Sequence, residues 1–102
     1  MLDNMVDDVM IVEGEQDADE QERAFAIQRL INNGCWKFQG SIGREMMRHI
    51  EAGRCMLGKN ASTDYWGNRV PSRDDIKPGC MGTRSYVAER MGEKYAEELS
   101  NV

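Results

Sequence analysis

Four side chains in this sequence have the chemistry of zinc ligands: Cys35, His49, Cys55 and Cys80. Three thiolates and one imidazole would suit tetrahedral zinc. Structural zinc sites usually take their ligands in close pairs, about two to four residues apart. Here the closest two candidates, His49 and Cys55, are six residues apart. We therefore expect no metal and no cofactor, and we interpret the cysteines as small apolar side chains inside the protein.

Groups suited to catalysis are few. His49 is the only histidine, so a general base near neutral pH would have to be His49 or a carboxylate with a raised pKa. His49 falls beside the apolar positions of a predicted helix, which favours a structural role. No serine lies in a nucleophile-elbow pattern, and no glycine pattern matches a phosphate-binding loop. The sequence therefore predicts a binding protein rather than an enzyme.

Charge is unevenly distributed along the chain. The first 22 residues carry nine carboxylates and no basic side chain, whereas all 13 Lys and Arg follow, against nine further acids. An acidic end on a mildly basic body suits the approach to a positively charged partner. The alternative is a solvated tail whose last acids only serve the dipole of the following helix. The candidate contact residues of this acidic front are Asp3, Asp7, Asp8, Glu13 and Glu15.

A second candidate surface combines arginines with aromatic rings. Arg44 and Arg48 lie one turn apart on a predicted helix, and Tyr65, Trp66 and Arg69 lie in a predicted loop. Aromatic rings in a basic groove can stack on the bases of single-stranded nucleic acid. A sequence pI near 4.8 argues against strong binding of this kind. The alternative is a mixed-charge surface on which Trp66 holds the loop against the core.

The fold expected to position these residues is α-rich, with an α+β arrangement as the alternative. Apolar residues recur at helical spacing in three segments. Asp17 is the predicted N-cap of the first helix, with Glu20 completing a capping box. Ser41 and Thr83 are the predicted caps of the other two, and Gly92 falls inside the last. The expected helices cover about residues 17–33, 41–52 and 83–99.

Short extended segments and one long loop are expected to join these helices around a single small core. Cys35–Gln39 alternates apolar and polar residues, as a short strand or extended connector does. Val9–Val12 fits either a buried strand or the start of a helix. The loop, residues 58–82, is rich in turn formers, and loops of this length are usually functional or held by a ligand. Within it, Asp64–Arg69 fits the tip of a hairpin.

Length and composition limit the class of protein. A chain of 102 residues is expected to form a single domain, 1–102. Its segment 1–16 is acidic, and the sequence allows this segment to be either ordered or partly flexible. The longest apolar run has four residues, against about 20 needed to span a bilayer. The start of the chain offers acids where a secretory signal has basic and apolar residues. We expect a cytoplasmic protein with reduced thiols and no membrane contact.

An acidic start with Asp3, Asp7 and Asp8 is followed by a helix and then by the segments 67–71, 76–79 and 86–90. This order of features resembles that of the short TraR-type members of the TraR/DksA family. In that family an acidic N-terminal tip enters the secondary channel of RNA polymerase, so the resemblance implies this partner for the acidic front. The family's zinc finger has two Cys-x-x-Cys knuckles, whereas in this chain Cys55 and Cys80 are not followed by a second cysteine, so the set of zinc-finger cysteines is incomplete. The likeness covers about half of the chain.

These observations favour a small, non-enzymatic acidic protein that binds and modulates a host machine handling nucleic acid. The expected partner is a host protein complex with a cationic groove or channel. A first alternative is an inhibitor, of the sort mobile elements encode, that imitates DNA against a nuclease, restriction or CRISPR-type complex. A second is a weak RNA- or single-strand-binding module. Changing Asp3, Asp7 and Asp8 to Asn separates them, since partner binding should be lost in the first two cases only.

Overall fold

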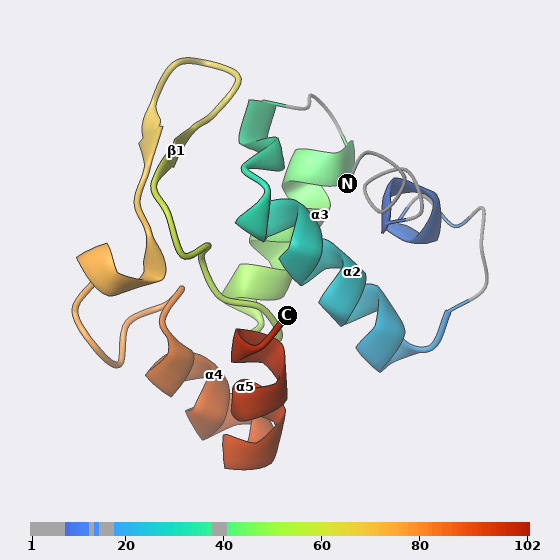
Figure 1. The fold of residues 1–102 in the computed structure, drawn as a ribbon, viewed down its shortest axis with the longest axis vertical. Coiled ribbons are helices and arrows are strands. Elements are labelled where there is room, and N and C mark those ends of the chain that lie inside the picture. The colour runs from blue at the N-terminus through green and yellow to red at the C-terminus, as the bar shows by residue number, and fades with distance from the viewer. Residues whose placement is uncertain (1–7, 13, 15–17, 38–40) are drawn as a thin grey trace.

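The computed structural model describes residues 8–12, 14, 18–37 and 41–102. The described part is rich in helix and carries a two-stranded antiparallel sheet, which confirms the predicted α-rich class. α2 crosses the middle of the molecule, with the hairpin on one side and helical residues 8–12 on the other (Figure 1). The elements are α2 (Glu20–Asn32), the 3₁₀ helix η1 (Cys35–Lys37), α3 (Ser41–Glu51), β1 (Ser62–Thr63), β2 (Arg69–Val70), the 3₁₀ helix η2 (Arg73–Asp75), α4 (Arg84–Met91) and α5 (Glu93–Ser100).

The N-cap of α2 is Asp19, so the prediction of Asp17 was wrong. The Asp19 carboxylate accepts a hydrogen bond from the Glu22 backbone N–H at 2.7 Å, and the Glu22 carboxylate accepts one from the Asp19 N–H at 3.4 Å. Both aspartates have a glutamate three residues later, so the sequence pattern fits either one. Asp17 itself lies outside the described residues.

α2 and α3 pack their apolar faces together and form the main core. The predicted helix 41–52 is confirmed as α3, although Ser41 is its first helical residue rather than its cap. The backbone of Met56 joins this core through the buried amide of Gln28, which exchanges two hydrogen bonds with it at 2.9 and 2.8 Å. The buried apolar residues that α2 and α3 contribute to this core are Ala24, Ile27, Leu30, Ile31, Ile42, Met46 and Ile50.

The segment after α2 is a 3₁₀ helix at Cys35–Lys37, so the strand predicted there was wrong, and residues 38–40 lie outside the described part. Gly34 turns the chain at a φ of +71°, and a Cβ at this position would meet the Ser62 hydroxyl at 2.9 Å. The turn carries Cys35 and Trp36 together into the core, because a 3₁₀ helix does not alternate its side chains between two faces. The apolar residues of this segment therefore indicated that it contributes to the core, but not that it is extended.

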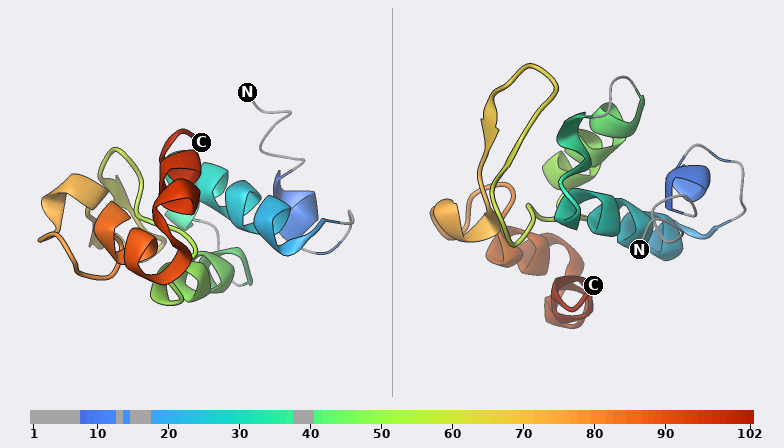
Figure 2. Two further views of the ribbon diagram at one scale, coloured as in Figure 1. Left: turned by 90° about the horizontal axis from the view of Figure 1, so that it is seen from below. Right: turned by 45° about the horizontal axis from the view of Figure 1, so that its top comes forward.

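The helix predicted at 83–99 is broken in two. Gly92 has φ 96° and ψ 158°, a conformation reserved for glycine, and α4 and α5 lie against each other on either side of it (Figures 1 and 2). Thr83 is the N-cap of α4, as predicted. Met91, the last residue of α4, is exposed. The described residues thus form two apolar clusters rather than one core, and the second consists of Met56, Val87, Ala96 and Leu99.

The long segment 58–82 contains a hairpin, as predicted for Asp64–Arg69. Ser62 pairs with Val70 and Thr63 with Arg69, and the Asp64 N–H donates to the Asn68 carbonyl at 2.9 Å across the tip. After the hairpin, Arg73 of η2 ties the segment to the core. Its guanidinium donates to the Leu57 carbonyl at 2.8 Å and to the Asn32 side chain at 3.2 Å.

Residues 8–12 are helical, which decides between the strand and the helix expected for Val9–Val12. Val9 and Val12 pack against the main core, and the Arg23 guanidinium of α2 donates to the Ile11 carbonyl at 2.7 Å. These contacts hold the short helix against the N-terminal half of α2.

Candidate binding groove

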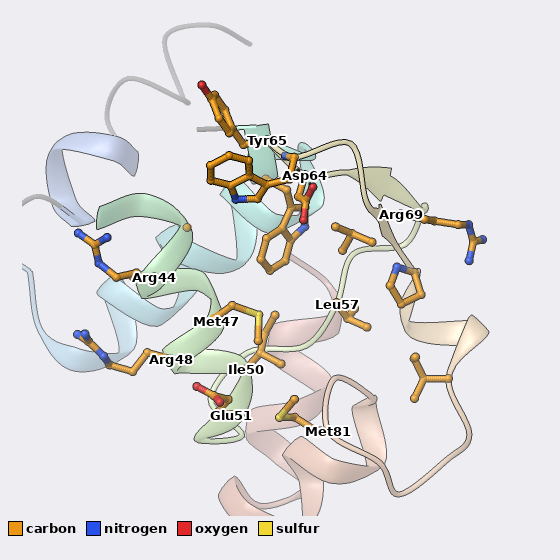
Figure 3. A pocket seen from close by; sticks show the side chains of 16 residues that line it. Arg44, Met47, Arg48, Ile50, Glu51, Leu57, Asp64, Tyr65, Arg69 and Met81 are labelled. Atoms are coloured by element: carbon orange, nitrogen blue, oxygen red, sulfur yellow. Dashed lines mark hydrogen bonds between the residues drawn. The ribbon is translucent and has the colours of Figure 1, made fainter. Parts of the chain in front are cut away.

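A groove of about 1030 Å³ lies between α3 and the β1–β2 hairpin (Figure 3). α3 forms one wall with its residues 43, 44, 47, 48, 50 and 51, and the hairpin forms the other with residues 64–66 and 69–71. Trp36, Ile50 and Leu57 belong both to the groove lining and to the main core, so the floor of the groove is the outer layer of that core. Met81, just before α4, lies at the end of the groove away from Tyr65 (Figure 3), and Ile76 also belongs to the lining.

Exposed apolar side chains gather at this groove. Among the described residues, five large apolar side chains are classed as exposed, and four of them line the groove. Trp66 is 78% exposed, Tyr65 50%, Met81 42% and Met47 40%. Scattered exposed apolar residues are normal, but a cluster within one concavity is typical of a binding surface.

Asp64 fixes the hairpin tip that carries the two aromatic rings. Its carboxylate accepts hydrogen bonds from the backbone N–H groups of Trp66 at 2.9 Å and Asn68 at 2.8 Å. These bonds are local alternatives to strand pairing and define the turn. Tyr65 and Trp66 then meet edge to face, with centroids 4.9 Å apart. The aromatic wall is therefore held by the backbone of the tip.

The tip is also joined to the floor. The Tyr65 backbone N–H donates to the Trp36 carbonyl at 3.2 Å, and this bond links the hairpin to η1. At the opposite end, the Leu57 N–H donates to the Gly82 carbonyl at 2.9 Å, which fixes the segment bearing Met81. Both ends of the groove are thus anchored to core residues.

Arginines stand on both rims of the groove. Arg44 and Arg48 lie on the α3 rim and Arg69 on the hairpin rim, pointing away from the floor (Figure 3). Arg48 pairs with Glu45, whereas Arg44 has no ion-pair partner in the part of the chain that the structure describes. Arg69 pairs with Asp75 at 3.0 Å.

Two acids also line the groove, and they differ in what they offer a ligand. The Asp64 carboxylate is occupied by the N–H groups of its own turn. Glu51 is exposed at the Met81 end of α3. Behind the hairpin rim, the backbone N–H of Ser72 and, less strongly, the Arg69 guanidinium lower the pKa of Asp75. The α3 rim near Arg44 is therefore the part of the groove with an available positive charge.

All five residues proposed from sequence for the basic and aromatic surface line this one groove: Arg44, Arg48, Tyr65, Trp66 and Arg69. The alternative in which Trp66 holds the loop against the core is wrong, because the Trp66 side chain is largely exposed and Trp36 occupies the core position instead. The contact residues predicted from the sequence did not include Met47, Met81 or Asp64, which also line the groove. The only sequence signal for the methionines was their abundance, and Asp64 could have been found from the turn-forming residues that follow it.

The acidic front is only partly described. Asp3, Asp7, Glu13 and Glu15 lie outside the described residues. Asp8, expected to be a free contact acid, is buried and forms a two-pronged hydrogen bond and ion pair with Arg29, at 2.8 to 3.0 Å. The expectation failed for Asp8 because helical residues 8–12 turn its carboxylate toward α2.

The four residues with zinc-ligand chemistry are dispersed. Cys35 and Cys55 are buried and Cys80 is exposed, while His49 lies 2.9 Å from the Glu45 carbonyl through Nδ1. Burial raises the pKa of both buried thiols, and Asp8 adds to this effect at Cys35. Within residues 8–12, 14, 18–37 and 41–102, no three His, Cys, Asp or Glu side chains are grouped as metal ligands would be.

None of the described helices combines the length and the apolar character needed to cross a bilayer. Two of them, α4 and α5, have eight residues each, and α2 has 13. Comparison of the chain with models of protein families, with curated proteins and with solved structures found no match.

Proposed function

We propose that this chain is a non-enzymatic binding protein that attaches to a larger protein complex through the groove between α3 and the hairpin. The observation that carries the proposal is the position of its exposed apolar residues, four of which line that groove: Met47, Tyr65, Trp66 and Met81. Aromatic side chains at the centre of an interface commonly supply most of the binding energy. Methionines adapt their shape to a partner, which suits the two sides of the groove.

The complex that we propose as partner is a host machine that handles nucleic acid. Support comes from the uneven charge of the chain, since the acids outside the described part would add a second, electrostatic contact with a cationic channel. If the TraR/DksA resemblance holds, the machine is RNA polymerase. In the alternative, the chain inhibits a nuclease, restriction or CRISPR-type complex by imitating DNA. Asp8 is left out of this second contact because Arg29 already holds it.

A second candidate function is weak binding of RNA or single-stranded DNA. The exposed rings of Tyr65 and Trp66 and the nearby cations Arg44 and Arg48 favour it. The net charge of −5 and the largely apolar floor count against it.

Affinity capture tests the proposed function. The tagged protein is incubated with a lysate of the cells in which it occurs, and captured proteins are quantified by mass spectrometry. The test variant carries Trp66→Ala and Met47→Ala. The control is Met91→Ala, since Met91 is 41% exposed, like Met47, but lies outside the groove. The proposal expects a partner that the test variant loses and the control retains. A partner captured equally by both variants would refute it.

The acidic front is tested in the same assay. Asp3→Asn, Asp7→Asn, Glu13→Gln and Glu15→Gln are combined in one variant, and Glu97→Gln and Glu98→Gln on α5 serve as a control. Retention of the partner by the four-fold variant would remove the acidic front from the proposal while leaving the groove in place.

A further inference from the structure

We propose that the groove binds a peptide segment of the partner protein that combines apolar side chains with carboxylates. This inference rests on the proposed function and names the chemistry of the segment. Four features of the groove carry it: the shape, the lining, the charge on the α3 rim, and the fixed aromatic wall.

The shape of the groove suits a chain segment. It runs between a helix of 11 residues and a hairpin, and its volume of about 1030 Å³ is at the upper end of the range usual for ligand pockets. A helix of this length is about 16 Å long, so the groove can accept a few turns of helix or a short extended peptide. A flat partner surface would leave the floor uncovered.

The lining selects apolar side chains from that segment. Ile50 and Leu57 lie in the floor, and Met47 stands beside them with its side chain turned toward the groove (Figure 3). An apolar side chain placed there would remove both its own surface and theirs from water, which is the main favourable term in association. A sugar–phosphate backbone would gain nothing from this floor.

The α3 rim selects carboxylates. Arg44 and Arg48 lie one turn apart, and Arg44 has no ion-pair partner among the described residues. A guanidinium on an open rim can bind a carboxylate through two parallel hydrogen bonds. Arg48 would have to exchange its contact with Glu45, so Arg44 is the principal cation. Glu51, at the other end of α3, disfavours carboxylates there and thus gives the bound segment a direction.

The backbone that carries the two aromatic rings is held in place before the segment binds. Asp64 holds the turn, and the Tyr65 backbone N–H is bonded to the Trp36 carbonyl. Trp66 therefore offers a broad apolar face whose backbone needs no further ordering. A loop backbone that is held in advance lowers the entropy cost of binding.

Labelled peptides test this chemistry directly. The probes are fluorescein-labelled peptides about 12 residues long, enough for about three helical turns, built from Leu, Phe and Glu in several orders. Matched sets replace Glu by Lys, or Leu and Phe by Ser, and an oligothymidylate of about 15 nucleotides represents single-stranded nucleic acid. Binding is measured by fluorescence polarisation at low and moderate salt.

The proteins compared are the wild type, Trp66→Ala, Arg44→Glu and two matched controls. Met91→Ala removes an exposed apolar side chain outside the groove, and Lys94→Glu makes the same change of charge on α5. We expect the Glu peptides to bind best, Trp66→Ala to weaken them about thirtyfold, and Arg44→Glu to weaken them about tenfold. Arg44→Glu should also improve binding of the Lys peptides, which a purely structural defect would not do. Circular dichroism confirms that each variant is folded.

The other outcomes separate this inference from the proposed function. Preferential binding of Lys peptides, or of the oligothymidylate in a Trp66-dependent way, would overturn the inference. So would failure of every probe while capture from the lysate still depends on Trp66, and in that case the proposed function stands. Capture that is insensitive to Trp66 and Met47 would overturn the proposed function itself.

Discussion

Gln28 and Met56 hold each other through two hydrogen bonds inside the protein. The Gln28 amide donates to the Met56 carbonyl at 2.9 Å and accepts from the Met56 N–H at 2.8 Å. Both residues are fully buried. The pair ties α2 to the segment that follows α3 and places Met56 in the second apolar cluster, with residues of α4 and α5.

Gln28→Met should therefore destabilise the protein while nearly preserving side-chain volume. Removal of the amide leaves the Met56 N–H and carbonyl buried without partners, at a cost of about 2–4 kcal/mol in the free energy of unfolding. Urea denaturation measures this loss. Gln21→Met, on the exposed side of the same helix, is the matched control and should change stability by less than about 0.5 kcal/mol. Similar values for both variants would show that the paired hydrogen bonds contribute little.

Asp64→Ala should loosen the aromatic tip of the groove. The change removes the acceptor for the Trp66 and Asn68 N–H groups. We expect a lower heteronuclear NOE at the Trp66 backbone amide and weaker capture of the partner. Asp64→Asn keeps an oxygen in the same place and should behave like the wild type. Equal loss in both variants would mean that the charge of Asp64, and not its hold on the turn, matters.

Gly92→Ala should cost about 1–3 kcal/mol through the backbone alone. No atom lies within 4 Å of the position that the new Cβ would take, so steric conflict with neighbours is absent among the described residues. The cost arises because φ is 96° and ψ is 158°, which a residue with a Cβ rarely adopts. Thermal unfolding measures it, with Lys94→Ala as an exposed control on α5. An unchanged melting temperature would mean that α4 and α5 can join without this break.

Alkaline pH should weaken the fold through Tyr95. Burial is the main cause that raises the pKa of Tyr95 to about 12 from an ordinary value of 10.0, and its hydroxyl donates to the Arg54 carbonyl at 2.7 Å. Because the folded pKa is above the unfolded one, the stabilising contribution is complete below pH 10 and is lost between about pH 10 and 12. The free energy of unfolding should fall across that interval.

Tyr95→Phe tests this origin. It should make the fall across that interval shallower, and a residual fall should remain because burial also raises the pKa of Cys55. Tyr65→Phe is the control, since Tyr65 is half exposed at the groove. A steep alkaline fall that persists in Tyr95→Phe would assign the effect elsewhere.

The sequence was most informative where local chemistry decides the structure. The helices around Ile27 and Met46 follow from apolar spacing, and Thr83 and the hairpin after Ser62 follow from capping and turn residues. The break at Gly92 could not be predicted with the same means. The cost of glycine inside a helix is only about 1 kcal/mol, so packing of α5 against α4 decides the outcome.

The candidate groove was predictable in its residues but not in its form. The five basic and aromatic candidates were grouped from the sequence because arginines beside aromatic rings can bind single-stranded nucleic acid. All five line the groove: Arg44, Arg48, Tyr65, Trp66 and Arg69. Their apolar floor depends on which of the two tryptophans is buried, and nothing local to either tryptophan indicates this. Asp8 illustrates the same limit, since its partner Arg29 is 21 residues away in sequence.

The floor of the groove has a thermodynamic consequence. Trp36, Ile50 and Leu57 serve the interior and the binding surface at once, so any compound that occupies the groove makes contact only with the native conformation. By mass action, a ligand present at a hundred times its dissociation constant adds about 2.7 kcal/mol to the free energy of unfolding. Heat denaturation of the purified protein in a panel of candidate ligands can therefore reveal occupancy without a label.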